Sequence, residues 1–223
     1  MEHAMIFLII MLTWNMRGKT LGKLFGSGTK VRLMRLFLFN PKVFMSTSEA
    51  ARKSKVSAEA ARKTIADMEK AGMVKRRTTT RVVNTRVGRK IKREKRKFAN
   101  GWRLNEKFAY LSQLSNLLIN TEPLTNNEII KRLSNIGRIK LIIVAGVFIQ
   151  SEDSRIDILV VGDKLKKGQI DGAIKNIEAE VGKELRYAVF DTSEFLYRLS
   201  VYDKLVRDIL DYPHKKVLSR LEL

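Results

Sequence analysis

Residues 73–104 alternate β-branched with basic side chains, a pattern that favours extended strands over this stretch. Gly88 stands near the middle of the stretch, where it can form a turn, so the sequence predicts a two-stranded hairpin. Between Lys75 and Lys97 the chain holds 12 basic residues and one acidic residue, Glu94. A two-stranded ribbon places alternate side chains on one face, so this hairpin presents a row of cations.

The charge of the whole chain is divided unevenly between its two halves. Residues 1–107 hold 27 Lys and Arg against 7 Asp and Glu, a net charge of +20 out of the total of +21. Residues 108–223 hold 17 against 16, a net charge of +1. This segregation predicts a polyanion partner and favours nucleic acid over an anionic membrane. The alternative is a surface tuned for solubility, but solubility does not require the segregation.

Composition excludes several kinds of site. The chain has no cysteine, which rules out disulfides, thiolate zinc sites and cysteine nucleophiles, and it has only two distant histidines, His3 and His214. We therefore expect no metal, no cofactor and a reducing, cytoplasmic location. The apolar run of residues 4–12 is shorter than the about 20 residues that cross a bilayer, and it lacks the features of a signal peptide, so we expect no membrane partner.

Three helices are expected before the hairpin. Residues 29–39 carry apolar side chains at helical spacing, and Asn40-Pro41 ends that helix. After a short extended piece at residues 42–45, Ser46-Thr47-Ser48 offers caps for a second helix that runs to about Lys53. Ser57 caps the third helix, and Gly72 is placed to end it.

The third helix divides into an inward and an outward face. Ala61, Ile65 and Met68 recur at helical spacing and are expected to pack inward. The residues left outward, near the amino end of the helix, are Ser57, Ala58, Arg62 and Lys63.

Residues 49–74 resemble the helix-turn-helix of winged-helix transcriptional regulators, with Ala51 where the helices cross and Val56 in the turn. The resemblance implies that the third helix enters the major groove of duplex DNA and that the hairpin is the wing. Arg62 can donate two hydrogen bonds to guanine O6 and N7, and Lys63 can contact a base or a phosphate. The alternative is a protein-interaction module of the same fold.

The hairpin is longer than the wing of a compact winged helix. We expect Trp102 to pack against the hairpin or the core and not to stack on a base. The cations expected to contact DNA from the hairpin are Lys75, Arg77, Arg81, Arg86, Arg89, Lys90, Lys92 and Arg93.

The second half alternates helices with buried strands, which is typical of a small α/β unit. A helix is expected over residues 108–124, where apolar side chains form one stripe and link the two halves. Further helices are expected from a Thr125 cap to about Ser134, over 164–181 before Gly182, from a Thr192 cap, and over 201–210. Strands are expected at residues 141–145, 156–161 and 186–190.

Residues 144–163 resemble the minimal nucleotidyltransferase fold, and the likeness extends over residues 141–211. Members of that family hold triphosphate with a Gly-Ser turn after one strand and magnesium with Asp-x-Asp at the start of the next. Here Gly146 matches the glycine and Asp157 matches the second aspartate, but Val147 replaces the serine and Arg155 replaces the first aspartate. We therefore expect a residual pocket at Gly146 and Asp157 with no catalytic residue and no metal.

One alternative is a metal held by Glu152, Asp153 and Asp157 on the loop between the two strands. The usual state of such acidic loop residues is solvation by water.

The expected fold is α+β: a winged helix-turn-helix with a long basic β-hairpin wing, a linking helix and a degenerate nucleotidyltransferase-like domain. The expected divisions are an extension at 1–22, the DNA-binding domain at 23–107, the linking helix at 108–124 and the α/β domain at 125–223. The expected function is sequence-specific binding of duplex DNA as a transcriptional regulator, without enzymatic activity.

A homodimer fits paired half-sites, although nothing in the sequence requires one. The second domain would then bind a small-molecule ligand or mediate dimerisation. The alternatives are an RNA-binding or ribosome-associated protein that uses the hairpin, and a divergent but active nucleotidyltransferase.

Overall fold

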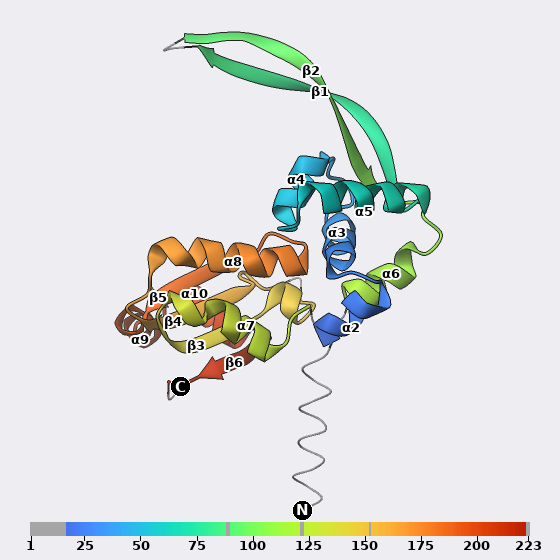
Figure 1. Ribbon diagram of the computed structural model, residues 1–223. Helices are drawn as coiled ribbons and strands as arrows, with labels where there is room; N and C mark the ends of the chain where they lie inside the picture. The colour runs from blue at the N-terminus through green and yellow to red at the C-terminus, as the bar shows by residue number, and fades with distance from the viewer. Residues whose placement is uncertain (1–16, 88–89, 121–122, 152, 222–223) are drawn as a thin grey trace, which may run out of the picture.

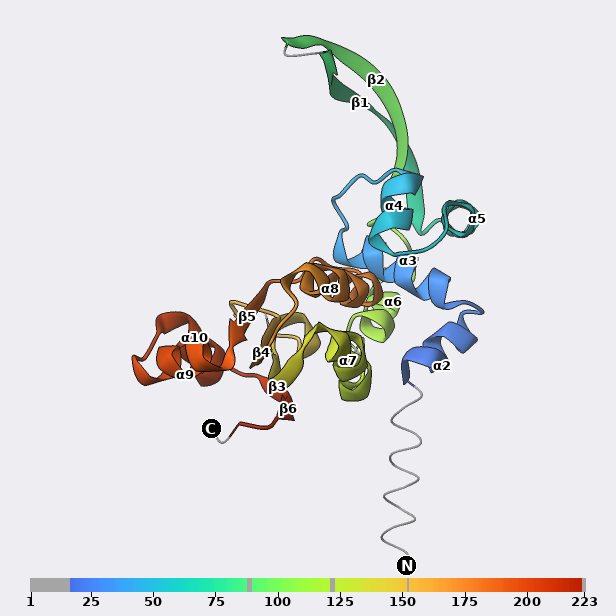
Figure 2. The ribbon, with the colours of Figure 1, turned by 60° about the vertical axis from the view of Figure 1, so that its left-hand side comes forward.

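Over the residues that the structure describes, the protein is a mixed α+β structure with two separate β-sheets (Figure 1). A computed structural model describes residues 17–87, 90–120, 123–151 and 153–221. A two-stranded hairpin projects away from a group of helices, and a four-stranded sheet lies beside that group (Figures 1 and 2). Within the described residues no helix has the length and apolar content needed to cross a membrane.

In the described part of the chain, four helices precede the hairpin: α2 (Arg17–Leu24), α3 (Gly28–Phe39), α4 (Thr47–Lys53) and α5 (Ala58–Lys70). The predicted caps are confirmed, since the hydroxyl of Ser46 accepts from the amide of Glu49 and that of Ser57 accepts from the amide of Ala60. Helix α3 begins at Gly28, one residue earlier than predicted and directly after its N-cap Ser27. Helix α2 lies across the predicted boundary at residue 22 and packs against α3.

The hairpin consists of β1 (Val74–Val87) and β2 (Lys90–Leu104), as predicted. Its register runs from Val74 opposite Leu104 to Val87 opposite Lys90, with one irregularity between Val83 and Thr85. The extended piece predicted at residues 42–45 adds a single bridge, because Met45 and Trp102 exchange two main-chain hydrogen bonds of 3.0 and 2.8 Å. This bridge ties the base of the hairpin to the helices.

One hydrophobic core joins α3, α4, α5 and the hairpin base. Leu33 and Phe37 of α3, Met45, and Ile65 of α5 are fully buried in it. Helix α6 (Leu111–Leu118) packs on the same core and is shorter than the helix predicted over 108–124. Part of that predicted helix, residues 121–122, lies outside the described residues.

The four-stranded sheet has the order β5-β4-β3-β6. Strand β4 runs parallel to β5, and β3 runs antiparallel to both β4 and β6. The elements of this half are α7 (Asn126–Leu133), η1 (Ser134–Ile136), β3 (Arg138–Val144), η2 (Gly146–Phe148), β4 (Ile158–Asp163), α8 (Lys167–Val181), β5 (Tyr187–Asp191), α9 (Thr192–Ser200), α10 (Lys204–Asp211) and β6 (Lys215–Ser219).

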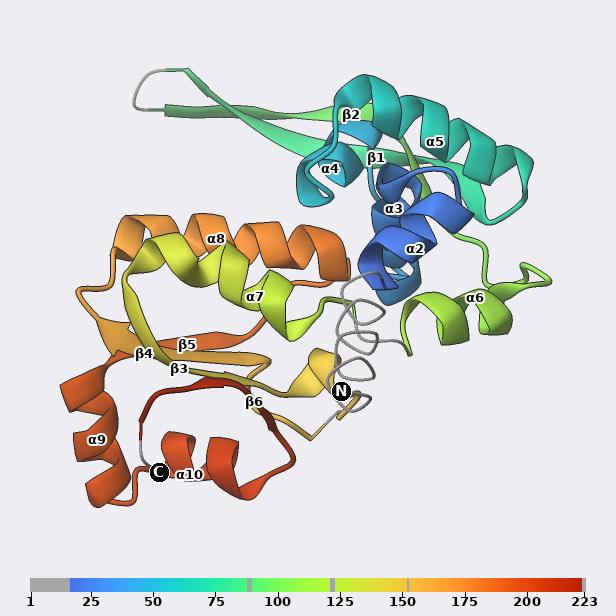
Figure 3. The same ribbon diagram turned by 60° about the horizontal axis from the view of Figure 1, so that its bottom comes forward.

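Helices cover both faces of this sheet, with α7 and α8 on one face and α9 and α10 on the other (Figure 3). Ile142 and Val144 of β3 pack into the core beneath α7 and α8, and Leu141 and Ile143 pack into the core beneath α9 and α10. Burial on both faces explains why the strand is a continuous apolar run in the sequence.

Three predictions at the carboxyl end need correction. Thr192 is the first residue of α9 and not its cap, because Asp191 holds the N-cap position without a side-chain hydrogen bond. The helix predicted over 201–210 begins at Lys204, because the Asp203 carboxylate caps it by accepting from two amides. Strand β6 is not predicted, because the half-exposed sequence of residues 215–219 shows no buried run; its pairing with β3 makes it a strand.

The two halves meet where α8 packs against α3. The guanidinium of Arg35 lies in this contact, with Nε donating to the Leu118 carbonyl at 3.0 Å and Nη1 to the Glu180 carbonyl at 3.1 Å. The Asn40 side-chain amide donates to the Gly182 carbonyl at 3.0 Å. Lys55, in the turn between α4 and α5, donates to the Asn176 side chain on α8 at 2.5 Å.

Replacing Thr125 with alanine is expected to lower the free energy of unfolding by about 1 kcal/mol. Thr125 and Glu128 form a reciprocal capping box at the start of α7, and the alanine variant loses the acceptor for the Glu128 amide. Urea unfolding measures the change, and Thr125→Ser serves as control because it keeps the hydroxyl. Equal stability of the alanine and serine variants would contradict the role of the cap.

Candidate nucleic-acid interface

The amino end of α5 is an exposed face on a firmly packed helix. Ala61, Ile65 and Met68 are buried in the core, as predicted. Ser57, Ala58, Arg62 and Lys63 are exposed. Among the described residues, neither Arg62 nor Lys63 forms an ion pair. Their charges are therefore open to an anionic partner.

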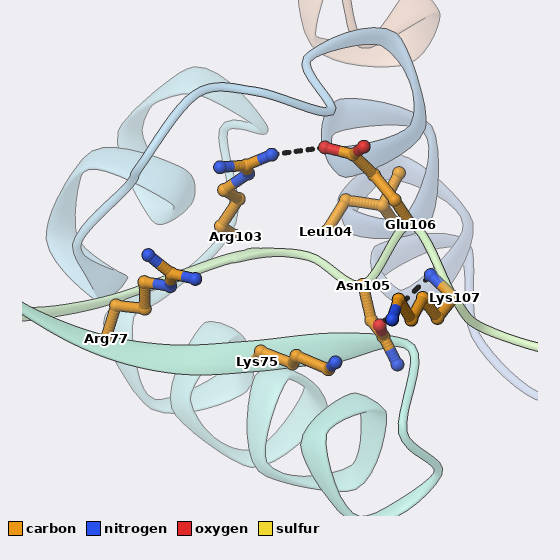
Figure 4. A pocket seen from close by; sticks show the side chains of 7 residues that line it. All are labelled: Lys75, Arg77, Arg103, Leu104, Asn105, Glu106 and Lys107. Atoms are coloured by element: carbon orange, nitrogen blue, oxygen red, sulfur yellow. Dashed lines mark hydrogen bonds and ion pairs between the residues drawn. The ribbon is translucent and has the colours of Figure 1, made fainter.

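A second group of cations lies at the base of the hairpin. The register pairs Lys75 with Arg103 and Arg77 with Gly101, so the three basic side chains share one face of the ribbon. They surround a hollow of about 170 Å³ that also includes Glu106 (Figure 4). Lys75 and Arg77 are exposed, as predicted.

Sequence reasoning missed Arg103 and Lys107, the other two cations of this hollow. Arg103 pairs with Glu106, and its Nε donates to the Pro41 carbonyl at 3.2 Å. Strand alternation could have placed Arg103 beside Lys75, but Lys107 follows the hairpin and carries no such signal. The hollow therefore holds four cations against one carboxylate.

The orientation of the hairpin base relative to α5 is fixed by packing. Trp102 is partly buried against the core, and its Nε1 donates to Glu69 of α5 at 3.3 Å. Asn105 donates to the Gly72 carbonyl at 2.7 Å, just beyond the end of α5. The packing role predicted for Trp102 is confirmed. The exposed cations of the hairpin base thus hold a defined position relative to α5.

The rest of the predicted hairpin site is described only as backbone. Arg81, Arg86, Lys90, Lys92 and Arg93 lie on the two strands, and their side chains are outside the described residues, as is Arg89 altogether. Strand β1 has 14 residues, which corresponds to roughly 46 Å of extended chain. The ends of β1 and β2 that are distant from the hairpin base therefore lie well away from α5. Figure 1 shows the hairpin curving above the helices.

Gly146 and Asp157 come together between β3 and β4. The Asp157 side chain is 1% exposed; Oδ1 accepts from the Val147 amide at 3.1 Å and Oδ2 from the Arg186 amide at 2.9 Å. Gly146 has a φ of +53°, and a Cβ there would overlap the Asp157 carboxylate. Asp157 therefore fastens the turn after β3 to the start of β5.

The neighbouring charged residues do not gather around Asp157 as ligands. Arg155 forms an ion pair with Asp208 of α10 at 2.5 Å, and Asp153 is exposed. Glu152 lies outside the described residues. No three His, Asp or Glu side chains converge as metal ligands in the part of the chain that the structure describes.

A cavity of about 530 Å³ opens beside Gly146 and Asp157. Phe39 at the end of α3, Asn120 just beyond α6, and Lys183 and Arg186 between α8 and β5 line it. No family model, no curated protein and no solved structure matches this chain.

Proposed function

We propose that the protein binds duplex DNA as a transcriptional regulator, with α5 as the recognition helix and the hairpin as the wing of a winged helix-turn-helix. The observation that carries the proposal is that two groups of exposed cations, one on α5 and one on the hairpin, are held in a fixed position relative to each other. Arg62 and Lys63 lie at the amino end of α5, and Lys75 and Arg77 lie on the hairpin, whose base is fixed to α5 through Trp102.

The two groups suit different parts of DNA. An arginine near the amino end of a recognition helix can donate two hydrogen bonds to O6 and N7 of guanine, which distinguishes one base pair from another. Cations along a hairpin contact phosphates, which supply affinity without sequence information. In this proposal Arg62 and Lys63 provide specificity, and the hairpin provides affinity that falls steeply as salt rises.

The α/β half is proposed to be non-catalytic. Its sheet places Gly146 and Asp157 beside one another, but both Asp157 oxygens already accept main-chain hydrogen bonds. Arg155, at the position of the missing aspartate, is paired with Asp208. A cytoplasmic location, a homodimer and a small-molecule ligand belong to the same proposal.

Selection from a pool of random duplexes tests the proposal. The wild-type protein is expected to enrich a short motif, and Arg62→Ala/Lys63→Ala is expected to lose that motif while it keeps salt-sensitive background binding. The matched control is Lys166→Ala/Lys167→Ala, which removes two exposed cations from the start of α8.

The regulator proposal fails if neither protein enriches a motif and the α5 variant binds duplex DNA as the control does. Tighter binding to structured RNA than to duplex DNA, unaffected by the α5 variant, would instead establish an RNA-binding protein. Magnesium-dependent nucleotide incorporation that disappears in Asp157→Ala would establish an active transferase.

A further inference from the structure

A second cavity, of about 660 Å³, lies between helices α2 and α3 of the first half and α7 and α8 of the second. Figure 1 places α2 and α5 on opposite sides of α3, so this cavity is remote from the proposed DNA-binding face. Its size falls within the roughly 300–1,000 Å³ of small-molecule sites. It is lined by Gly22, Lys23, Gly26, Gly28, Val31, Arg32, Arg35, Pro123, Leu124, Glu128, Arg132 and Glu180.

Cations outnumber carboxylates among these residues by four to two. Glu180 is shared, because its Oε1 accepts from Arg32 at 2.5 Å and from Arg132 at 3.0 Å. Arg35 is 3% exposed and donates to main-chain carbonyls, which carry no negative charge. Its burial lowers the pKa of the guanidinium, and nearby Glu180 and Glu128 act in the opposite direction. The cavity therefore carries positive charge that its own carboxylates do not balance.

Two groups of donors at this cavity have capacity for a ligand. The Arg32 side chain is 32% exposed, and its described hydrogen bond runs from Nη2 to Glu180, so its exposed guanidinium can also donate to a ligand. Helix α3 begins at Gly28 on the cavity wall, with no acidic residue in its first turn. The Ser27 hydroxyl accepts from the Thr29 amide, and the other first amides of the helix, which have no acceptor within it, favour an anion.

We propose that this cavity binds the phosphate group of a small molecule. A phosphate offers several acceptor oxygens and up to two negative charges, so it can accept from the exposed part of the Arg32 guanidinium, from Arg132 and from Lys23 at once. The remaining volume holds the rest of the molecule. The site is independent of the proposed DNA-binding surface.

Titration calorimetry of the full-length protein with inorganic phosphate, at constant ionic strength, tests this site. One saturable site per chain is expected. Arg132→Gln is expected to weaken binding roughly tenfold because it removes a charged donor. Glu180→Gln is expected to tighten binding because Glu180 competes with the ligand for Arg32 and Arg132. The control is Arg77→Gln on the hairpin, which is expected to leave phosphate binding unchanged.

Glu180→Gln also removes an ion pair between the halves, so Lys23→Gln provides a second variant that touches no described ion pair. It is expected to weaken phosphate binding while the melting temperature without phosphate stays at the wild-type value. The proposal is overturned if no saturable binding occurs, or if Arg77→Gln abolishes it while Arg132→Gln and Lys23→Gln do not. Duplex DNA affinity of Arg132→Gln should equal that of wild type, so failure of this site and failure of the DNA proposal are distinguishable.

Discussion

Replacing Gly182 with alanine is expected to lower the free energy of unfolding by about 3 kcal/mol, the sum of backbone strain and overpacking. Gly182 ends α8 with a φ of +87°, a conformation that side chains other than glycine rarely adopt. A Cβ at this position would also lie 2.7 Å from two main-chain atoms, the carbonyl carbon of Arg35 and the nitrogen of Leu36. Neither main-chain atom can move without shifting α3.

Gly172→Ala is the matched control for this prediction because it makes the same change within α8. An added Cβ at Gly172 meets no atom within 4 Å, so we expect a gain of about 0.5–1 kcal/mol from helix propensity. Urea unfolding of the two variants therefore gives shifts of opposite sign. Equal stabilities would contradict both the left-handed backbone of Gly182 and its close contact with α3.

Elements whose signals are local could be predicted from the sequence. Ser46, Ser57 and Thr125 cap their helices because a hydroxyl three residues before an amide needs no distant partner. The inward face of α5 follows from the spacing of Ala61 and Ile65 alone. The exposure of Arg62 and Lys63 followed with it, so this part of the candidate site was accessible to sequence reasoning.

Features that depend on distant partners could not be predicted. Arg35 sits among apolar residues of α3, and only the carbonyls of Leu118 and Glu180 explain why it is buried. Strand β6 exists because β3 offers it an edge. The cavity proposed to bind phosphate is lined by helices that lie about a hundred residues apart in the chain, and no local sequence pattern predicts that these helices pack together.

Shortening the hairpin is expected to weaken duplex DNA binding by roughly a hundredfold or more near physiological salt. The variant deletes residues 79–99 and joins Thr78 to Asn100 through Asn-Gly, a two-residue turn suited to a hairpin. It removes nine basic residues and one acidic residue. The remaining base keeps the Met45–Trp102 bridge and the hydrogen bond of 3.0 Å between Thr78 and Asn100.

The salt series distinguishes charge from length as the cause of that weaker binding. Removing one cation that neutralises a phosphate reduces the slope of log affinity against log salt by about 0.9. A full-length variant, Lys90→Gln/Lys92→Gln/Arg93→Gln, keeps the length of the hairpin and should show part of the same reduction in slope. If it binds with the wild-type slope while the shortened protein does not, the hairpin acts through its reach and not through its cations. Because Arg62 and Lys63 remain in both variants, the motif enriched by the wild type should persist at low salt.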